Sequence, residues 1–235
     1  MKLVLSCLAA LSLPAAHDLS ASPLAGRRIA FIGDSYVRNH RNAVEDTWHY
    51  KLAAKHGMEY HNYGRNGGCI AFDRAKFGPS ILKRFGEMED GLDYVVMIAG
   101  HNDAGFIQKG DGNNSVSPER QAENFTTFTN GLDRLCTGLR AKYPSATIVF
   151  ISPWRVERAY FSEVMEAERA AAARHGFAFF DAAHLSGVNP NDPEERKAWF
   201  QGPNDTAHLN PKGHDRVLPV FEKFFLSLPS AKAGG

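Results

Sequence analysis

A serine, two histidines and two aspartates in this chain have the types and spacing that nucleophilic catalysis requires. Ser35 follows Gly33 and Asp34 directly after the apolar run 29–32. A serine hydroxyl is a weak nucleophile at neutral pH, so it needs a base, a group that orients the base, and donors for an oxyanion. Taken alone, Gly-Asp-Ser also fits an ordinary turn. Ser35 is therefore a candidate nucleophile whose partners must lie elsewhere in the chain.

Two Asp-x-x-His segments offer a base. Asp181 precedes His184 by three residues, and Asp205 precedes His208 by the same spacing. In both segments the carboxylate lies about one helical turn from the imidazole and could orient it. Their contexts differ, because Asp181 ends a predicted strand whereas His208 is followed by the start of the last predicted helix.

Two further segments offer donors for an oxyanion. The glycine-rich turn 62–68 follows the second predicted strand, and its amides can approach a bound group closely because glycine has no Cβ. Asn102 follows the third predicted strand and offers a side-chain amide, and one such donor typically contributes about a hundred- to a thousandfold in rate. Asp103 is expected to hold the turn. Each segment by itself also fits a plain connection between a strand and a helix.

The elements that must position these residues form an α/β pattern. Short β-branched or aromatic runs alternate with longer segments of helical period, which is typical of a parallel sheet covered on both faces. The predicted strands lie near 28–33, 58–63, 93–99, 146–151 and 177–181. The predicted helices are Ala43–His56, Arg74–Glu87, Pro118–Tyr143, Val156–His175 and Pro211 to about Leu226. Chemistry in such sheets collects beyond the carboxyl ends of the strands.

Two polar segments, Lys109–Ser117 and His184–Thr206, are long enough to be functional loops near those strand ends. They are equally well explained as surface loops that take no part in binding or catalysis.

Length and composition limit the number of domains and the classes of function. A chain of 235 residues fits one domain, and without a linker-like segment residues 23–235 are assigned to it. The 27 basic and 26 acidic residues nearly cancel and form no long run, which argues against a nucleic-acid partner. No later segment is apolar for long enough to span a bilayer. The cysteines and histidines lack CxxC and HExxH spacing, so no metal or cofactor is expected. Whether Cys69 and Cys136 pair stays open.

The first residues are typical of a secretory signal peptide. Lys2 precedes the apolar run 3–13 and a small-residue ending, although the cleavage point is poorly defined. Residues 1–22 are therefore expected to be a signal peptide or an N-terminal extension, with a docked helix of a cytoplasmic protein as the alternative. A glycan on the N-x-T site at Asn204 would crowd Asp205, so a bacterial periplasm or extracellular location is expected.

Four segments in this order and spacing resemble the SGNH, or GDSL-type, hydrolase superfamily. They are 33–35, 62–67, 100–103 and 205–208, and the resemblance spans about residues 27–228. It implies a flavodoxin-like α/β/α fold with a mostly five-stranded parallel sheet and no cofactor. The site residues that it implies are the nucleophile Ser35, the base His208, its partner Asp205, and an oxyanion hole of Ser35, Gly67 and Asn102.

This chain departs from the family pattern at three places. Tyr36 stands where the GDSL name has leucine, which changes the pocket rather than the reaction. Gly68 next to Gly67 leaves a one-residue ambiguity for the oxyanion amide. His101 replaces a residue that is often small, which limits the space beside Asn102.

The resemblance implies hydrolysis of an ester through an acyl-enzyme. Exported relatives often remove short acyl groups from carbohydrate, so O-acetyl groups on carbohydrate are the expected substrate. Tyr36, Trp154 and Arg155 are expected to line the cleft, with Trp154 either stacking on a sugar or packing in the core. The alternatives are a lipase or acyl-thioesterase of the same superfamily and a noncatalytic glycan-binding module. A nucleotide-binding domain is disfavoured because no G-x-G-x-x-G follows the first strand. The oligomeric state is left open.

Overall fold

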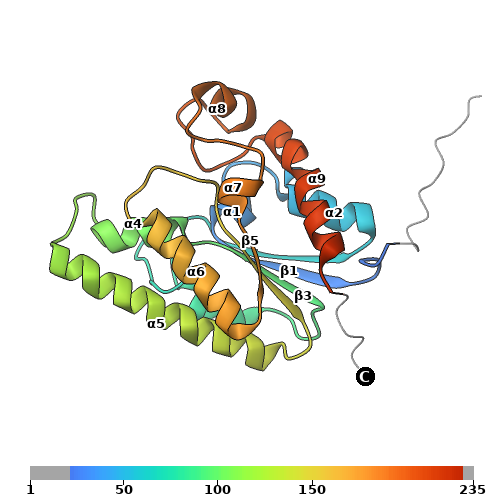
Figure 1. The fold of residues 1–235 in the computed structure, drawn as a ribbon, viewed down its shortest axis with the longest axis horizontal. Helices are drawn as coiled ribbons and strands as arrows, with labels where there is room; N and C mark the ends of the chain where they lie inside the picture. The colour runs from blue at the N-terminus through green and yellow to red at the C-terminus, as the bar shows by residue number, and fades with distance from the viewer. Residues whose placement is uncertain (1–21, 230–235) are drawn as a thin grey trace, which may run out of the picture.

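The computed structural model describes residues 22–229, which form a five-stranded sheet with helices on both faces (Figure 1). All neighbouring strands pair in parallel, in the order β2-β1-β3-β4-β5. The strands are β1 Arg28–Gly33, β2 Glu59–Gly64, β3 Tyr94–Ile98, β4 Thr147–Ile151 and β5 Ala178–Phe180. The predicted α/β/α fold and the five predicted strands are confirmed.

The helices differ widely in length. The longer ones are α2 Trp48–His56, α4 His101–Lys109, α5 Pro118–Lys142, α6 Phe161–His175 and α9 Pro211–Ser227. The shorter ones are α1 Ser35–Arg38, α3 Ile81–Arg84, α7 Ala182–Leu185 and α8 Pro193–Trp199, with 3₁₀ turns η2 Val44–Asp46 and η3 Phe85–Glu87. Helices α2 and α9 cover one face of the sheet, and α4, α5 and α6 cover the other (Figure 1).

Strand β1 shows why the sheet needs two covering layers. Ala30 and Ile32 belong to the cluster that packs against α5, whereas Ile29 and Phe31 belong to the cluster that packs against α2 and α9. All four side chains are fully buried. Because successive side chains of a strand point to opposite faces, an unbroken apolar run requires cover on both.

Two predicted helices begin later than expected. The segment predicted as Ala43–His56 has the turn η2 first, and the Thr47 hydroxyl then accepts the N–H of Tyr50 at 3.2 Å and caps α2. The segment predicted from Val156 has irregular backbone up to Tyr160, so α6 begins at Phe161. Local capping sets the first of these boundaries.

The predicted helix Arg74–Glu87 is wrong. Arg74 and Gly78 form an isolated antiparallel bridge, and a short α3 and the turn η3 follow. Pro79 cannot donate a backbone hydrogen bond in a helix, and Asp73 accepts the N–H of Ser80 at 3.0 Å, which competes with helical bonding. Helix α8 lies within the segment expected to be a loop, and α4 was not predicted.

Several expectations concern the ends and the cysteines. Residues 1–21 of the expected signal peptide lie outside the described residues, so export stays a prediction. Between residues 22 and 229, no helix is both long and apolar enough to span a membrane. Cys69 and Cys136 are free thiols and both are buried, so they do not form a disulfide.

Candidate active site

The connections that follow β1, β2 and β3 converge at the carboxyl end of the sheet. Asp34 donates its N–H to the carbonyl of Ile98 at 3.3 Å, and Arg65 donates its N–H to the carbonyl of Gly33 at 3.1 Å. Gly33 has no room for a side chain, because a Cβ there would lie 2.1 Å from the Ile98 oxygen. This close approach brings the three connections into contact.

Ser35 is the first residue of α1, directly beyond this junction. Asp34 caps the helix, since its Oδ1 accepts the N–H of Tyr36 at 2.9 Å. Burial raises the pKa of Asp34 to about 7, while the hydrogen bond from Tyr36 opposes that shift. Among residues 22–229, the N–H of Ser35 has no hydrogen-bond acceptor, so it is available to a ligand.

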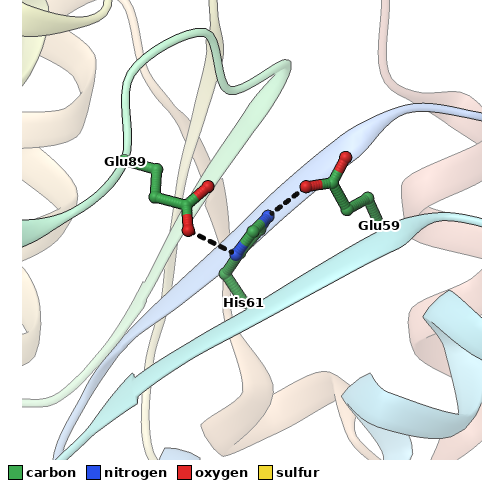
Figure 2. A group of neighbouring side chains, drawn as sticks. All are labelled: Glu59, His61 and Glu89. Carbon is green, nitrogen blue, oxygen red and sulfur yellow. Dashed lines mark hydrogen bonds and ion pairs between the residues drawn. The ribbon is translucent and has the colours of Figure 1, made fainter.

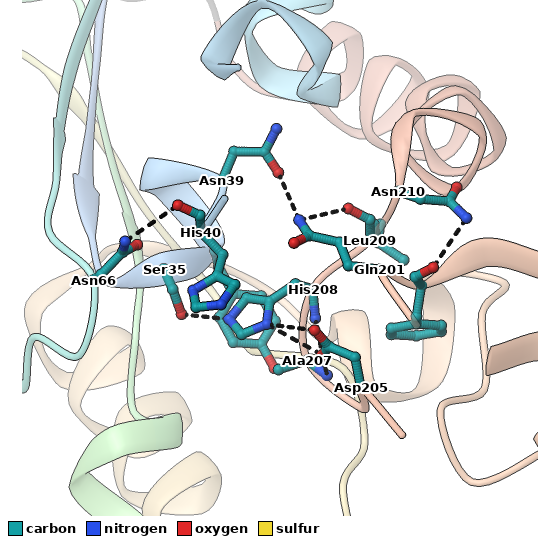
Figure 3. A network of polar contacts seen from close by, with 12 residues as sticks. Ser35, Asn39, His40, Asn66, Gln201, Asp205, Ala207, His208, Leu209 and Asn210 are labelled. Carbon is teal, nitrogen blue, oxygen red and sulfur yellow. Dashed lines mark hydrogen bonds and ion pairs between the residues drawn. The ribbon is translucent and has the colours of Figure 1, made fainter. Parts of the chain in front are cut away.

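The side chains of Ser35, His208 and Asp205 form a continuous chain of hydrogen bonds (Figure 3). The Ser35 Oγ lies 2.8 Å from His208 Nε2, and His208 Nδ1 lies 2.9 Å from Asp205 Oδ2. Because Nδ1 donates its proton to the carboxylate, Nε2 is an acceptor for the serine hydroxyl. This arrangement can withdraw a proton from Ser35.

Asp205 holds the segment that carries the histidine as well as the imidazole itself. Its Oδ1 accepts the N–H groups of Ala207 at 2.9 Å and His208 at 2.8 Å. Burial raises the pKa of Asp205, but the hydrogen bonds from His208 and Ala207 outweigh it and lower the pKa to about 2. The carboxylate is therefore ionised at any ordinary working pH.

The other Asp-x-x-His segment makes the same local bond but lies apart from Ser35. His184 Nδ1 lies 2.9 Å from Asp181 Oδ1, and Arg169 pairs with Asp181 at 2.5 Å. The His184 side chain is 60% exposed and makes no hydrogen bond to a serine among the described residues. The structure thus brings Asp205 and His208, rather than Asp181 and His184, to the serine.

The glycine-rich turn offers one free amide. Gly68 donates its N–H to the carbonyl of Arg65 at 3.0 Å, whereas the N–H of Gly67 has no acceptor among residues 22–229. Gly67 has a φ of 71°, and a Cβ there would lie 2.4 Å from the ring of Phe77. Of the two adjacent glycines, only Gly67 has an amide available to an oxyanion.

Asn102 lies at the same junction, and its amide is already engaged. Nδ2 donates to Asp34 Oδ2 at 3.0 Å and to the carbonyl of Gly68 at 3.1 Å. An amide nitrogen carries two protons, so an oxyanion must either displace one of these acceptors or share a proton with it. These bonds fix the orientation of Asn102, and its part in an oxyanion hole stays a prediction.

His40 contacts the site and was not predicted from the sequence. Its ring stacks on that of His208, with centroids 4.1 Å apart and planes 11° from parallel. Asn39 and His40 both have left-handed backbone, and the His40 carbonyl accepts Asn66 Nδ2 at 3.2 Å (Figure 3). Burial lowers the pKa of His40, and the neighbouring His208 lowers it further. A lone histidine in an irregular segment carries no periodic signal that predicts this contact.

Asn39 ties α1 to the segment that precedes His208. Gln201 Nε2 donates to Asn39 Oδ1 at 3.5 Å and to the carbonyl of Leu209 at 3.2 Å (Figure 3). His214 Nε2 also lies 3.1 Å from Asn39 Oδ1. Burial lowers the pKa of His214 to about 3, so this histidine is neutral and structural.

Two of the three expected substrate-contacting residues are buried, and the third lines a separate hollow. Trp154 is 4% exposed and donates Nε1–H to the carbonyl of Ala207 at 2.8 Å, so it has no free face on which a sugar could stack. Tyr36 is 6% exposed and its ring packs 5.7 Å from that of Trp154. Arg155 is exposed and lines a separate hollow with Asp181 and His184. Trp154 instead supports the segment that bears His208.

Arg158, three residues after Arg155, is one of the cations that border the site. Its Nη1 donates to the carbonyl of His101 at 2.9 Å, and it lines a hollow of about 270 Å³ together with Asn102. A larger hollow of about 840 Å³ is lined by His208, Asp205, His40 and residues 200–204. The two hollows therefore adjoin different members of the site.

Among the described residues, one cluster of side chains has ligand types suited to a metal ion. One ligand atom each of Glu59, His61 and Glu89 lie within 4.8 Å of one another (Figure 2). Arg28 already pairs with Glu59 at 3.2 Å and with Glu89 at 2.7 Å. Glu59 starts β2, five residues before Gly64, so it lies roughly 16 Å from the carboxyl end of that strand. The cluster is an ion-pair network remote from Ser35.

Comparison with known proteins now identifies the family. The model of the GDSL-like Lipase/Acylhydrolase family matches residues 31–216. The chain belongs to this family. The predicted superfamily is thus confirmed, and membership indicates a hydrolase of the esterase or lipase type. Among curated proteins, none matches the chain.

Several solved structures share the fold. A protein from Lactobacillus plantarum is 22% identical, with a TM-score of 0.69 over 86% of this chain and 97% of that chain. Phospholipase A1 from Streptomyces albidoflavus is 20% identical, with a TM-score of 0.55 over 85% of this chain and 99% of that one. A family two carbohydrate esterase from Clostridium thermocellum is 14% identical, with a TM-score of 0.58 over 85% of this chain and 63% of that one. At these identities the likeness establishes the fold alone.

Proposed function

We propose that this GDSL-family protein is a serine esterase that hydrolyses short-chain acyl esters through an acyl-enzyme. The observation that carries the proposal is the contact of 2.8 Å between Ser35 Oγ and His208 Nε2, with Asp205 bonded to the other ring nitrogen. A serine, an imidazole and a carboxylate in this order are the working parts of serine hydrolases on unrelated folds.

In the proposed reaction, Ser35 Oγ attacks the ester carbonyl and its proton passes to His208 Nε2. Asp205 stabilises the imidazolium that forms. The tetrahedral intermediate collapses when its C–O bond to the alcohol breaks, and His208 gives the proton to the departing oxygen. Water activated by His208 then attacks the acyl-Ser35 ester, releasing the acid and restoring the serine hydroxyl.

The negative oxygen of the intermediate is assigned to the free N–H groups of Ser35 and Gly67 and to the side chain of Asn102. In this proposal the oxyanion takes the place of the Gly68 carbonyl on Asn102 Nδ2, while Asp34 keeps the amide aimed at the site. Such preorganised donors are typically the largest electrostatic contribution to acyl transfer.

O-Acetyl groups on carbohydrate are the proposed substrate. The hollow beside His208 supports this, because hydrogen-bonding side chains provide much of its lining. They are His40, Arg41, Asn42, Gln201, Asn204, Asp205, Thr206, His208 and Asn210. A polar alcohol that leaves from His208 matches this lining better than a lipid does. The clostridial carbohydrate esterase has the same fold, which is compatible with the proposal.

The test combines acyl-chain profiling with labelling of the nucleophile. The protein should hydrolyse 4-nitrophenyl acetate faster than the decanoate, release acetate from acetylated sugars, and react with a fluorophosphonate probe at Ser35. Ser35→Ala should lose labelling and nearly all turnover, while Ser145→Ala, on an exposed loop, should keep both. A folded protein that neither labels nor turns over esters would refute the proposal in favour of a noncatalytic binding module. A preference for decanoate would refute the substrate class.

A further inference from the structure

The smaller hollow beside the candidate active site is lined by cations. It measures about 270 Å³, and Asn102 forms part of its wall. Its charged lining residues are Arg74, Lys109 and Arg158, and among the described residues that line it none is acidic. The larger hollow beside His208 lacks this concentration of charge, since Arg41 is its only Lys or Arg among the described residues and Asp205 is present.

Helix α4 and the segment after β4 build the hollow. Asn102, Gly105 and Lys109 lie at spacings of three and four residues, so they share one face of α4. Gly105 leaves this face open, because a Cβ there would lie 3.0 Å from Arg158 Nη1. The guanidinium of Arg158 therefore lies over the first turns of the helix, close to Asn102.

Phe77 links the hollow to Gly67, the second candidate oxyanion donor. The ring of Phe77 lines it, and this ring lies against the backbone of Gly67, where a Cβ would be 2.4 Å away. A group bound in the hollow is consequently next to Asn102, and the Phe77 side chain separates it from Gly67. It would belong to the same substrate whose carbonyl reacts with Ser35.

Two of the three cations that line the hollow lack an ion-pair partner among the described residues. Arg74 pairs with Asp111 at 2.8 Å, but neither Arg158 nor Lys109 has an ion-pair partner among residues 22–229. Arg158 makes one hydrogen bond, to the His101 carbonyl, which leaves further N–H groups unused. Burial lowers the pKa of Arg158, the charges of Tyr36 and Asp34 oppose that shift, and the positive charge of Arg74 adds to it.

We propose that this hollow is an anion subsite that binds a carboxylate of the ester substrate. The subsite rests on the proposed esterase function and defines its substrate class further. A planar guanidinium can bind a carboxylate through two parallel hydrogen bonds, and Lys109 adds a mobile point charge. The carboxylate can belong to the acyl group, as in a monoester of a dicarboxylic acid, or to an acidic sugar that carries the ester. The recognition chemistry is the same for both.

Two matched pairs of substrates test the subsite and separate the two sources. Ethyl hydrogen succinate and ethyl 4-methylpentanoate have acyl groups of similar shape, and only the first is charged. A mono-O-acetylated methyl glucuronide and the equally acetylated methyl glucoside make the corresponding pair for the alcohol. The charged member of at least one pair should show a kcat/KM higher by roughly tenfold to a hundredfold, the range expected for a charge-assisted hydrogen bond. Added salt should reduce the preference, because the hollow is open to solvent.

Variants assign the preference to this hollow. In Arg158→Met and Lys109→Met the ratio of kcat/KM between charged and neutral esters should fall towards one, and Arg158→Lys should keep part of it. Lys109 is exposed, so its variant provides a second measurement should Arg158→Met fold poorly. Arg155→Met is the matched control, because it removes an exposed cation three residues away that lines a different hollow. Its ratio and its turnover of neutral esters should equal those of the wild type.

The outcomes are distinguishable. Equal kcat/KM for charged and neutral esters in both pairs would overturn the subsite and leave the esterase proposal intact. A preference that survives in both Arg158→Met and Lys109→Met would also overturn it. Failure to hydrolyse any of the four esters would overturn the esterase function and the subsite with it.

Discussion

Replacing Asp205 by asparagine tests the hydrogen-bond chain at its most informative point. In the structure, Asp205 Oδ1 accepts two backbone N–H groups, while Oδ2 accepts Nδ1–H of His208 at 2.9 Å. An asparagine can keep the two backbone contacts with its single oxygen. Its NH₂ group would then face His208 Nδ1. Because an NH₂ group can only donate, Nδ1 would have to be unprotonated and accept this hydrogen bond.

The substitution would therefore force the other tautomer of His208. Nε2 would carry the proton and could no longer accept the one from Ser35, now 2.8 Å away. The same exchange in a well-studied serine protease lowers kcat by about ten thousandfold. A similar loss here corresponds to about 5.5 kcal/mol in activation free energy. Because the backbone contacts persist, the thermal midpoint should change little.

The assay measures kcat for 4-nitrophenyl acetate together with the thermal midpoint. Asp181→Asn is the control, since Asp181 makes the same bond of 2.9 Å to its own histidine, but that histidine makes no hydrogen bond to a serine among the described residues. The control variant should retain wild-type kcat. A loss of less than tenfold in Asp205→Asn, or an equal loss in both variants, would refute this tautomer argument.

Three further predictions concern the surroundings of the site. Trp154→Phe removes the donor to the buried Ala207 carbonyl, so unfolding free energy should fall by about 1–3 kcal/mol and kcat should decrease; an unchanged thermal midpoint would contradict this. Gly67→Ala should lower kcat by roughly a hundredfold, because the positive φ and the Phe77 ring both oppose a Cβ; wild-type kcat would show that this amide is not used. Glu168→Gln should raise stability more at pH 8 than at pH 5, as measured by denaturant unfolding at both values. The Glu168 carboxyl is buried and has no hydrogen-bond partner within residues 22–229, and burial holds its pKa well above the usual value. The folded state therefore binds the extra proton and loses stability as pH rises; an equal effect at both pH values would contradict that reasoning.

Local patterns in the sequence were sufficient for the sheet. The run 29–32 is apolar at every position, which requires cover on both faces, and the Gly-Asp-Ser that follows ends the strand and caps α1. Where two local signals competed, the prediction failed. The segment Arg74–Glu87 has helical periodicity, but Pro79 and the hydrogen bond between Asp73 and Ser80 prevent a continuous helix there.

The sequence also predicted Ser35, Asp205 and His208 as site residues. An aspartate three residues before a histidine can bond to it locally, so the spacing identified Asp205 and His208 as a candidate pair. It could not choose between the two Asp-x-x-His segments from their spacing. That choice depends on how the last helix packs, which brings His208 to a serine 173 residues away.

Other features of the site were decided only by tertiary structure. Residue type and position just after a predicted strand identified Trp154 and Arg155 as candidates, but the direction of an irregular segment after β4 buries Trp154 and places Arg158, rather than Arg155, beside Asn102. The stacking of His40 on His208 likewise joins two irregular segments. Residue patterns encode short-range hydrogen bonding and burial, whereas the meeting of distant irregular segments depends on the packing of the whole chain.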